Sequence, residues 1–194
     1  MGCNLLVNLV LYSKGANMKN YFIDLVNKRQ SCRDFNDKPI EKETVLEIAK
    51  TASLSPSACN SQPWKMYLVT DEVAVKGVKE AVQDQGHNLF TEKAKAFIAV
   101  SEVDARLKTF VRSRYRGDHF IKYDIGELVA YITLTAESMG VSTCILGWMD
   151  PQKLKTAVNM PEEETCSIVI ALGYSDIEVR EKKRKPLEEI IVEV

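Results

Sequence analysis

The chain has 194 residues, of which 45% are hydrophobic and 27% charged, and its net charge is −1. These values are typical of one globular domain with a sizeable core, and they exclude a general attraction to nucleic acid or to an acidic membrane. Any anion site must therefore be local. Five cysteines without a CxxC pair favour free thiols in a reducing cytoplasm, and with two histidines they argue against a zinc site.

The first 17 residues, MGCNLLVNLVLYSKGAN, differ from the rest of the chain. Their apolar run is too short to span a membrane, and no positively charged region precedes it as in a signal peptide. We therefore predict an N-terminal extension over residues 1–17 and a single domain over residues 18–194.

Hydrophobic periodicity predicts alternating helices and strands from there on. Helices are expected over residues 21–29, over 41–52 with Pro39 opening the helix, and over 71–86 with Gly86 as its stop. The run 118–140 has the longest helical pattern and predicts the central core helix, and a short helix is expected over 150–158. Strands are expected over 64–70, 95–103, 141–149 and 166–175. Because the helices come in pairs and the βαβ alternation is imperfect, we predict an α+β fold with a mixed, mainly antiparallel sheet flanked by helices.

Motifs for several common reaction types do not occur in the sequence. GxGxxG, GxxxxGK[ST], HExxH and GxSxG are absent, so a Rossmann nucleotide site, a P-loop, a zinc hydrolase and a nucleophile elbow lose support. His87 and His119 lie in polar surroundings and are interpreted as exposed side chains.

Two clusters of cations stand near opposite ends of the chain. In RQSCR, residues 29–33, an extended backbone would turn Arg29, Ser31 and Arg33 to one side, and a helix would put both arginines on one face. Such guanidinium and hydroxyl donors suit a phosphate monoester. The alternative is surface salt bridges with nearby carboxylates, namely Asp34, Asp37 and Glu41.

The second cluster is near the C-terminus and contains Arg180, Lys182, Lys183, Arg184 and Lys185. It can be a solvated tail. If the two ends of the chain meet, both clusters could surround one dianion.

The loop SLSPSACNSQP, residues 53–63, is rich in side chains that both donate and accept hydrogen bonds. Ser57, Asn60, Ser61 and Gln62 could read the edge of a heterocycle, although polar loops commonly have this composition. Trp64 could form a wall of such a site or could belong to the core.

Taken together, these segments resemble the nitroreductase family of FMN-dependent oxidoreductases. The resemblance runs from about Asn20 to the C-terminus and depends on four segments: KRQSCRDFNDKPI, SLSPSACNSQPWKMYLV, DIGELVAYITLTAESMGVSTCILGWMD and KKRKPLEEII. It implies an α+β homodimer with FMN held at the subunit interface.

The resemblance also implies roles for individual residues. Arg29, Gln30, Ser31 and Arg33 would bind the FMN phosphate and ribityl chain together with Lys182 and Arg184. Pro56, Ser57 and Ala58, with Asn60 nearby, would lie against the flavin of the partner subunit; Ala58 stands where serine is frequent. Leu146 and Gly147 match the turn whose backbone amide faces flavin N5. Lys93 matches a lysine near the pyrimidine edge, where it would stabilise negative charge.

The implied reaction passes a hydride from NADH or NADPH to the flavin and then reduces a nitroaromatic or quinone-like oxidant in a ping-pong cycle. No catalytic side chain and no metal are required. The segment 106–124 would form the substrate lid, with Phe110, Tyr115 and Phe120 as candidate lining residues, and the tail 188–194 would add an edge strand to the partner. Alternatives are a flavin dehydrogenase or dehalogenase with the same fold, a non-catalytic flavin-binding sensor, and a structural interaction protein.

Overall fold

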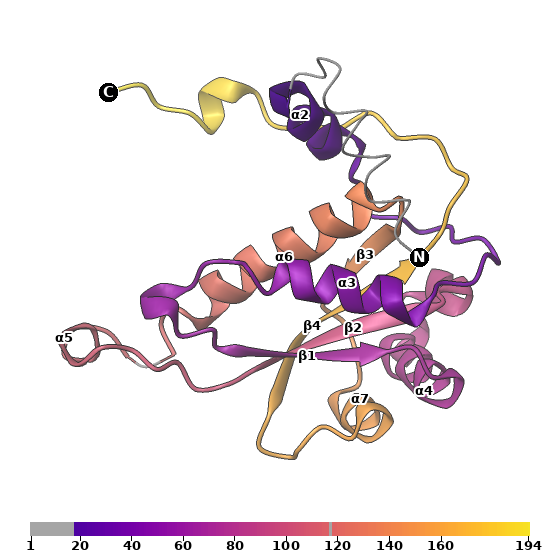
Figure 1. The fold of residues 1–194 in the computed structure, drawn as a ribbon, viewed down its shortest axis with the longest axis horizontal. Helices are drawn as coiled ribbons and strands as arrows, with labels where there is room; N and C mark the ends of the chain where they lie inside the picture. The colour runs from indigo at the N-terminus through magenta and orange to yellow at the C-terminus, as the bar shows by residue number, and fades with distance from the viewer. Residues whose placement is uncertain (1–17, 117) are drawn as a thin grey trace, which may run out of the picture.

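The computed structural model describes residues 18–116 and 118–194, so the predicted extension over residues 1–17 lies outside them. Four strands form one sheet in the order β1-β2-β4-β3 (Figure 1). The strands are β1 Trp64–Val69, β2 Ala96–Glu102, β3 Ser142–Leu146 and β4 Thr165–Gly173. The helices are α2 Met18–Lys28, α3 Lys42–Ala52, α4 Glu72–Val82, α5 Thr109–Arg112, α6 Ile121–Ser138 and α7 Pro151–Val158, with 3₁₀ turns η1 Ala58–Asn60, η2 Asp84–Gly86, η3 Leu89–Lys93 and η4 Leu187–Glu189.

The central strands explain why two layers of helices cover the sheet. β2 pairs with β1 and β4, and all three pairings in the sheet are antiparallel. Alternate residues of β2 belong to separate buried clusters: Ile98 and Val100 pack with residues of α3 and α6, whereas Phe97 and Ala99 pack with residues of α4 and α7. Both faces are therefore apolar, which is why β2 reads as a continuous hydrophobic run.

Helix α6 is the central helix that the sequence predicts. Its apolar stripe includes Ile125, Leu128 and Ile132, which are almost completely buried against the sheet. Tyr123 and Tyr131 on the same helix are exposed, so α6 also presents an aromatic surface to solvent in the single chain.

The predicted α+β fold with a mainly antiparallel sheet is confirmed, and the bounds of two predicted helices differ. Pro39 does not open α3, because the helix begins at Lys42 after the extended N-cap Glu41, and Ile40 packs against the core. The helix predicted over 71–86 ends at Val82 and continues only as η2. The tail 188–194 is exposed and forms no strand within this chain, and its predicted pairing with a partner's sheet stays a prediction.

A buried carboxylate, Glu164, connects three strands at one end of the sheet. Its side chain pairs with Lys65 and accepts hydrogen bonds from Tyr67 Oη and Ser101 Oγ, each at 2.7 Å. Burial acts to raise the pKa of Glu164, but the donors of Lys65, Ser101 and Tyr67 outweigh it, and the pKa falls below the ordinary value of 4.5. The ionised form therefore stabilises the fold.

Replacing Glu164 by glutamine should lower the free energy of unfolding at neutral pH by about 1–3 kcal/mol, because the buried donors lose a charged acceptor. Since the folded pKa is lowered, the contribution of Glu164 is present above pH 4.5 and is lost as the pH falls through the folded pKa. Urea unfolding at neutral pH and at steps below pH 4.5 measures both effects. Glu163→Gln, at an exposed neighbouring position, is the matched control; equal stability of the two variants would contradict the prediction.

Candidate functional site

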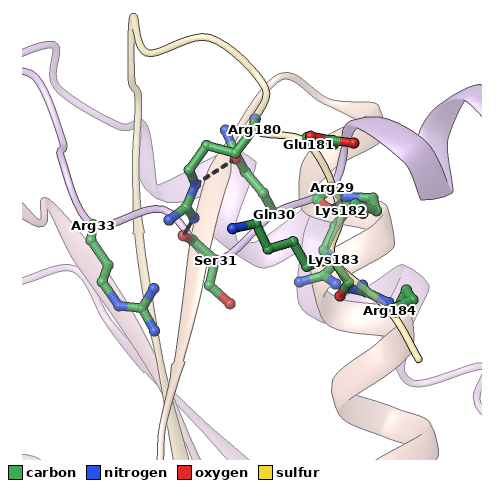
Figure 2. Close-up of a pocket in the computed structure, with 9 residues that line it drawn as sticks. All are labelled: Arg29, Gln30, Ser31, Arg33, Arg180, Glu181, Lys182, Lys183 and Arg184. Atoms are coloured by element: carbon green, nitrogen blue, oxygen red, sulfur yellow. Dashed lines mark hydrogen bonds between the residues drawn. The ribbon is translucent and has the colours of Figure 1, made fainter. Parts of the chain in front are cut away.

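A cavity of about 560 Å³ lies where the residues after α2 meet the C-terminal segment. Figure 2 shows that its side chains come from two stretches separated by most of the chain. Its lining residues are Arg29, Gln30, Ser31, Arg33, Arg180, Glu181, Lys182, Lys183 and Arg184. We call it the cation cavity.

The backbone of RQSCR is extended where it borders the cavity. Helix α2 ends at Lys28, and Ser31 forms a parallel bridge with Thr143 of β3. Cys32 donates its backbone N–H to the Thr143 carbonyl at 2.8 Å, and its side chain is only 1% exposed. Because side chains alternate along an extended chain, burial of Cys32 turns Ser31 and Arg33 outward.

Phe35, two residues after RQSCR, packs in the core and fixes this segment to the sheet. Its ring is buried, and the following Asn36 donates its backbone N–H to the Tyr174 carbonyl at 2.8 Å. Gly173 at the end of β4 permits this approach, since a Cβ there would lie 2.9 Å from Phe35 Cδ1. The segment that carries Arg29 and Arg33 is therefore fixed to the sheet on both sides of Cys32.

The C-terminal segment is attached to RQSCR by side chains that bond to its backbone and amide. Arg180 donates from Nη2 to the Ser31 carbonyl at 2.6 Å and from Nε to Gln30 Oε1 at 3.1 Å (Figure 2). Lys182 Nζ donates to the Arg29 carbonyl at 2.7 Å. The two cation clusters thus meet, as the sequence analysis considered, and neutral acceptors hold them together.

The cavity carries a large excess of positive charge. Six cations and one carboxylate, Glu181, line it. None of the ion pairs within residues 18–116 and 118–194 includes any of the six. Asp37, considered above as a partner of the arginines, pairs instead with Lys95 at 3.3 Å. The salt-bridge interpretation of RQSCR is therefore wrong for the described part of the chain, and the cations are available to an anion.

Burial and the mutual repulsion among these cations lower the pKa of Lys182. Burial lowers the pKa of its ammonium group, and the neighbouring charges of Arg29 and Arg184 lower it further. Glu137 on α6 acts in the opposite direction, but burial raises its own pKa. A bound dianion would relieve this repulsion, so the donor set fits a phosphate ester such as that of FMN.

The turn after β3 lies on the same side of the subunit as η3. β3 runs from Thr143, beside Ser31, to Leu146, which is buried; Gly147 follows and is exposed. Asn88 donates from Nδ2 to the Trp148 carbonyl at 3.3 Å, which ties the turn to the start of η3. The Arg33 guanidinium lies 6.0 Å from the ring centre of Phe90 in η3. Lys93, at the end of η3, is exposed and does not line the cation cavity.

Pro56, Ser57, Ala58 and Asn60 do not join the cavity in this chain. They lie beside the N-terminal half of α6, where Ala58 donates its backbone N–H to Asp124 Oδ1 at 3.0 Å. The cation cavity lies near Glu137, at the other end of the helix. Thirteen residues of α-helix separate Asp124 from Glu137, which corresponds to about 20 Å. Figure 1 agrees with this separation of η1 from α2 and the C-terminal segment.

The structure adds residues that the sequence-based site did not include. Arg180 and Lys183 line the cavity, although only Lys182 and Arg184 of that cluster were assigned to the cofactor. Asp124 is 4% exposed, holds the loop through Ala58 and has a second oxygen, Oδ2, without a partner in the described part of the chain. A carboxylate between Ile121 and Ile125, on the apolar stripe of the longest helix, was the signal that could have identified it. Trp64 belongs to the core, so the wall interpretation is not supported in the single chain.

Comparisons with known proteins show the family of the chain. The model of the nitroreductase family matches residues 26–174. An oxygen-insensitive NADPH nitroreductase of Helicobacter pylori is 30% identical, with 83% of this chain and 90% of that protein covered. An NADH dehydrogenase of Thermus thermophilus is 25% identical, with 85% and 92% covered.

Among solved structures, a putative nitroreductase of Exiguobacterium sibiricum in complex with FMN superposes with a TM-score of 0.76 at 20% identity. The superposition covers 89% of this chain and 97% of that one, which shows a shared fold. These names agree with the predicted type of enzyme, an NAD(P)H-dependent flavin oxidoreductase. The fold, the family match and the 30% identical relative together show that this chain belongs to the nitroreductase family.

Proposed function

We propose that the protein is an FMN-dependent oxidoreductase that takes a hydride from NADH or NADPH and reduces nitroaromatic or quinone-like acceptors. The observation that carries this proposal is the cation cavity, in which six cations without a carboxylate partner converge from both ends of the described chain. A phosphate monoester offers several anionic oxygens to such donors and suits them well.

Each side of the cavity has its own task in this proposal. Arg29, Ser31 and Arg33 bind the FMN phosphate from the segment fixed to β3, with Gln30 beside them. Lys182 and Arg184 bind it from the C-terminal segment. Arg180 bonds to Gln30 and Ser31, so it positions the two segments relative to each other.

Leu146 and Gly147, at the end of β3, would hold the flavin ring. The strand runs from the bridge at Ser31 to Leu146, so an elongated ligand held by the cation cavity can reach the exposed backbone of Gly147. Lys93 on η3 is the candidate for the pyrimidine edge, because Phe90 of the same turn already contacts Arg33. Bound FMN supplies the redox chemistry by accepting and releasing a hydride at N5, and the protein needs no nucleophile or metal of its own.

The remaining residues of the site come from a second copy of the chain in this proposal. Pro56, Ser57, Ala58 and Asn60 lie beside the N-terminal half of α6 and do not line the cation cavity, which lies near the other end of the helix. A homodimer would bring this loop against the partner's flavin. It would also cover exposed apolar side chains such as Tyr131 of α6 and Ile190 and Ile191 of the tail.

An absorbance spectrum of the purified protein, followed by anaerobic titration with NADH and NADPH, tests the proposal. We expect bound flavin, loss of its long-wavelength absorbance on addition of nucleotide, and its return with a nitroaromatic acceptor. Bound flavin that neither nucleotide reduces would support a non-catalytic sensor. Reduction without turnover of nitroaromatics or quinones would favour a dehydrogenase or dehalogenase with the same fold. A colourless protein that takes up no FMN would contradict every proposed function that depends on a bound flavin.

A further inference from the structure

The segment between β2 and α6 carries an unusual concentration of positive charge. Residues 105–116, which we call the basic segment, contain five basic residues and no acidic one: Arg106, Lys108, Arg112, Arg114 and Arg116. The segment includes α5 and projects from the end of the molecule where η1 lies and α6 begins (Figure 1). A second cavity, of about 840 Å³, lies between it and the loop at residues 59–62.

Most of these cations lack a carboxylate partner in the part of the chain that the structure describes. Arg116 pairs with Asp118 at 3.4 Å, but no ion pair there includes Arg106, Lys108, Arg112 or Arg114. Arg112 donates to the Ala105 carbonyl at 3.2 Å. Arg106 lines the second cavity, is exposed, and has no hydrogen bond or ion pair among residues 18–116 and 118–194.

The lining of the second cavity also includes neutral groups, one further cation, Lys65, and one carboxylate, Asp104. Asn60, Ser61 and Gln62 line the cavity, and the Ser61 hydroxyl is buried without a partner in the described residues. The guanidinium groups of Arg106 and Arg112, the amides and the Ser61 hydroxyl in the lining suit a nucleotide, which has phosphates and a heterocycle.

We propose that the second cavity receives the adenosine phosphate end of the pyridine nucleotide, and that Arg106 binds its 2′-phosphate and makes the enzyme prefer NADPH to NADH. This inference rests on the proposed function, in which the adjoining loop at residues 56–60 lies against the flavin. The 2′-phosphate is the group by which NADPH differs from NADH, and an arginine fork is suited to bind it with two hydrogen bonds. Family membership leaves the choice open, since one relative is named for NADPH and another for NADH.

The kinetic test compares Arg106→Ala with the wild type, both loaded with FMN. We expect the wild type to have the higher kcat/KM for NADPH. In the variant, kcat/KM for NADPH should fall by about tenfold to a hundredfold, which corresponds to the loss of one or two charge-assisted hydrogen bonds. The value of kcat/KM for NADH should change little. Arg114→Ala is the matched control, because it removes the same charge from the same segment at a residue that does not line the cavity. Equal losses in both variants would overturn the assignment in favour of a diffuse electrostatic effect.

A binding measurement tests the same contact without turnover. Calorimetric titration should show that adenosine 2′,5′-bisphosphate binds the wild type more tightly than adenosine 5′-monophosphate does, and that Arg106→Ala removes most of this difference. Equal binding of the two probes to the wild type would overturn the proposal. So would a variant whose only defect is a raised KM for an anionic acceptor such as 4-nitrobenzoate.

The two measurements separate this inference from the proposed function. Protein that binds no FMN, or that neither nucleotide reduces, would contradict the proposed function. The calorimetric titration still decides the inference in that case, because it needs only the folded protein as purified. Discrimination between the probes that depends on Arg106 would support a 2′-phosphate site, and its absence would overturn one.

Discussion

Replacing Arg33 by alanine is expected to raise the dissociation constant for FMN by about tenfold to a hundredfold, the cost of losing one strong charge-assisted contact to the phosphate. Arg33 is suited to this test because it lines the cation cavity, is exposed, and contacts only the ring of Phe90 among the interactions described above. Its loss should therefore leave the fold intact. Fluorescence titration of the FMN-free protein with FMN measures the change.

Two further variants show whether charge or geometry is responsible. Arg33→Lys keeps the charge but loses the planar fork, so an intermediate dissociation constant is expected. Lys42→Ala removes an exposed positive charge at the start of α3, outside the cavity, and should bind FMN as the wild type does. If Arg33→Ala retained wild-type affinity while folded, Arg33 would have no part in binding the phosphate.

A chain that ends at Val179 is expected to lose FMN binding altogether. The truncation removes four of the six cations of the cavity, namely Arg180, Lys182, Lys183 and Arg184. It also removes the bonds by which Arg180 and Lys182 attach the C-terminal segment to RQSCR. The sheet should survive, because β4 already ends at Gly173. Circular dichroism checks the fold, and the flavin absorbance of the purified protein reports the loss.

A chain that ends at Pro186 is the matched control, because it lacks only the tail beyond the cavity. This variant keeps all six cations and should still bind FMN. Size-exclusion chromatography of the same variant tests the tail: if residues 188–194 pair with the partner's sheet, its removal should weaken the dimer. Full flavin content in the shorter chain, ending at Val179, would show that the C-terminal cations do not hold the cofactor.

Several parts of the fold follow from local sequence alone. β2 is a nearly continuous apolar run, and the long stripe of α6 has a helical period, so the type of both elements and the core position of α6 were predicted. The alternating positions of Arg29, Ser31 and Arg33 in RQSCR also predicted a common side for these residues, because an extended backbone places Ser31 and Arg33 on the side opposite to Cys32. The prediction could not choose between an extended and a helical form, since five residues satisfy both periods. The bridge between Ser31 and Thr143 decides for the extended form.

The composition of the two cation clusters was readable from the sequence, but their meeting was not. Arg180 contacts Gln30 and Ser31, residues about 150 positions earlier in the chain, through the backbone and amide groups of that segment. No local pattern encodes such a contact, because it depends on β3 lying at the edge of the sheet next to the end of α2. The same holds for the absence of carboxylate partners of these cations among residues 18–116 and 118–194: Asp37 is close to Arg33 in sequence, yet its position in the fold pairs it with Lys95. Residue types thus determined which chemistry was possible, and the order of the strands decided which charges face one another and remain unpaired.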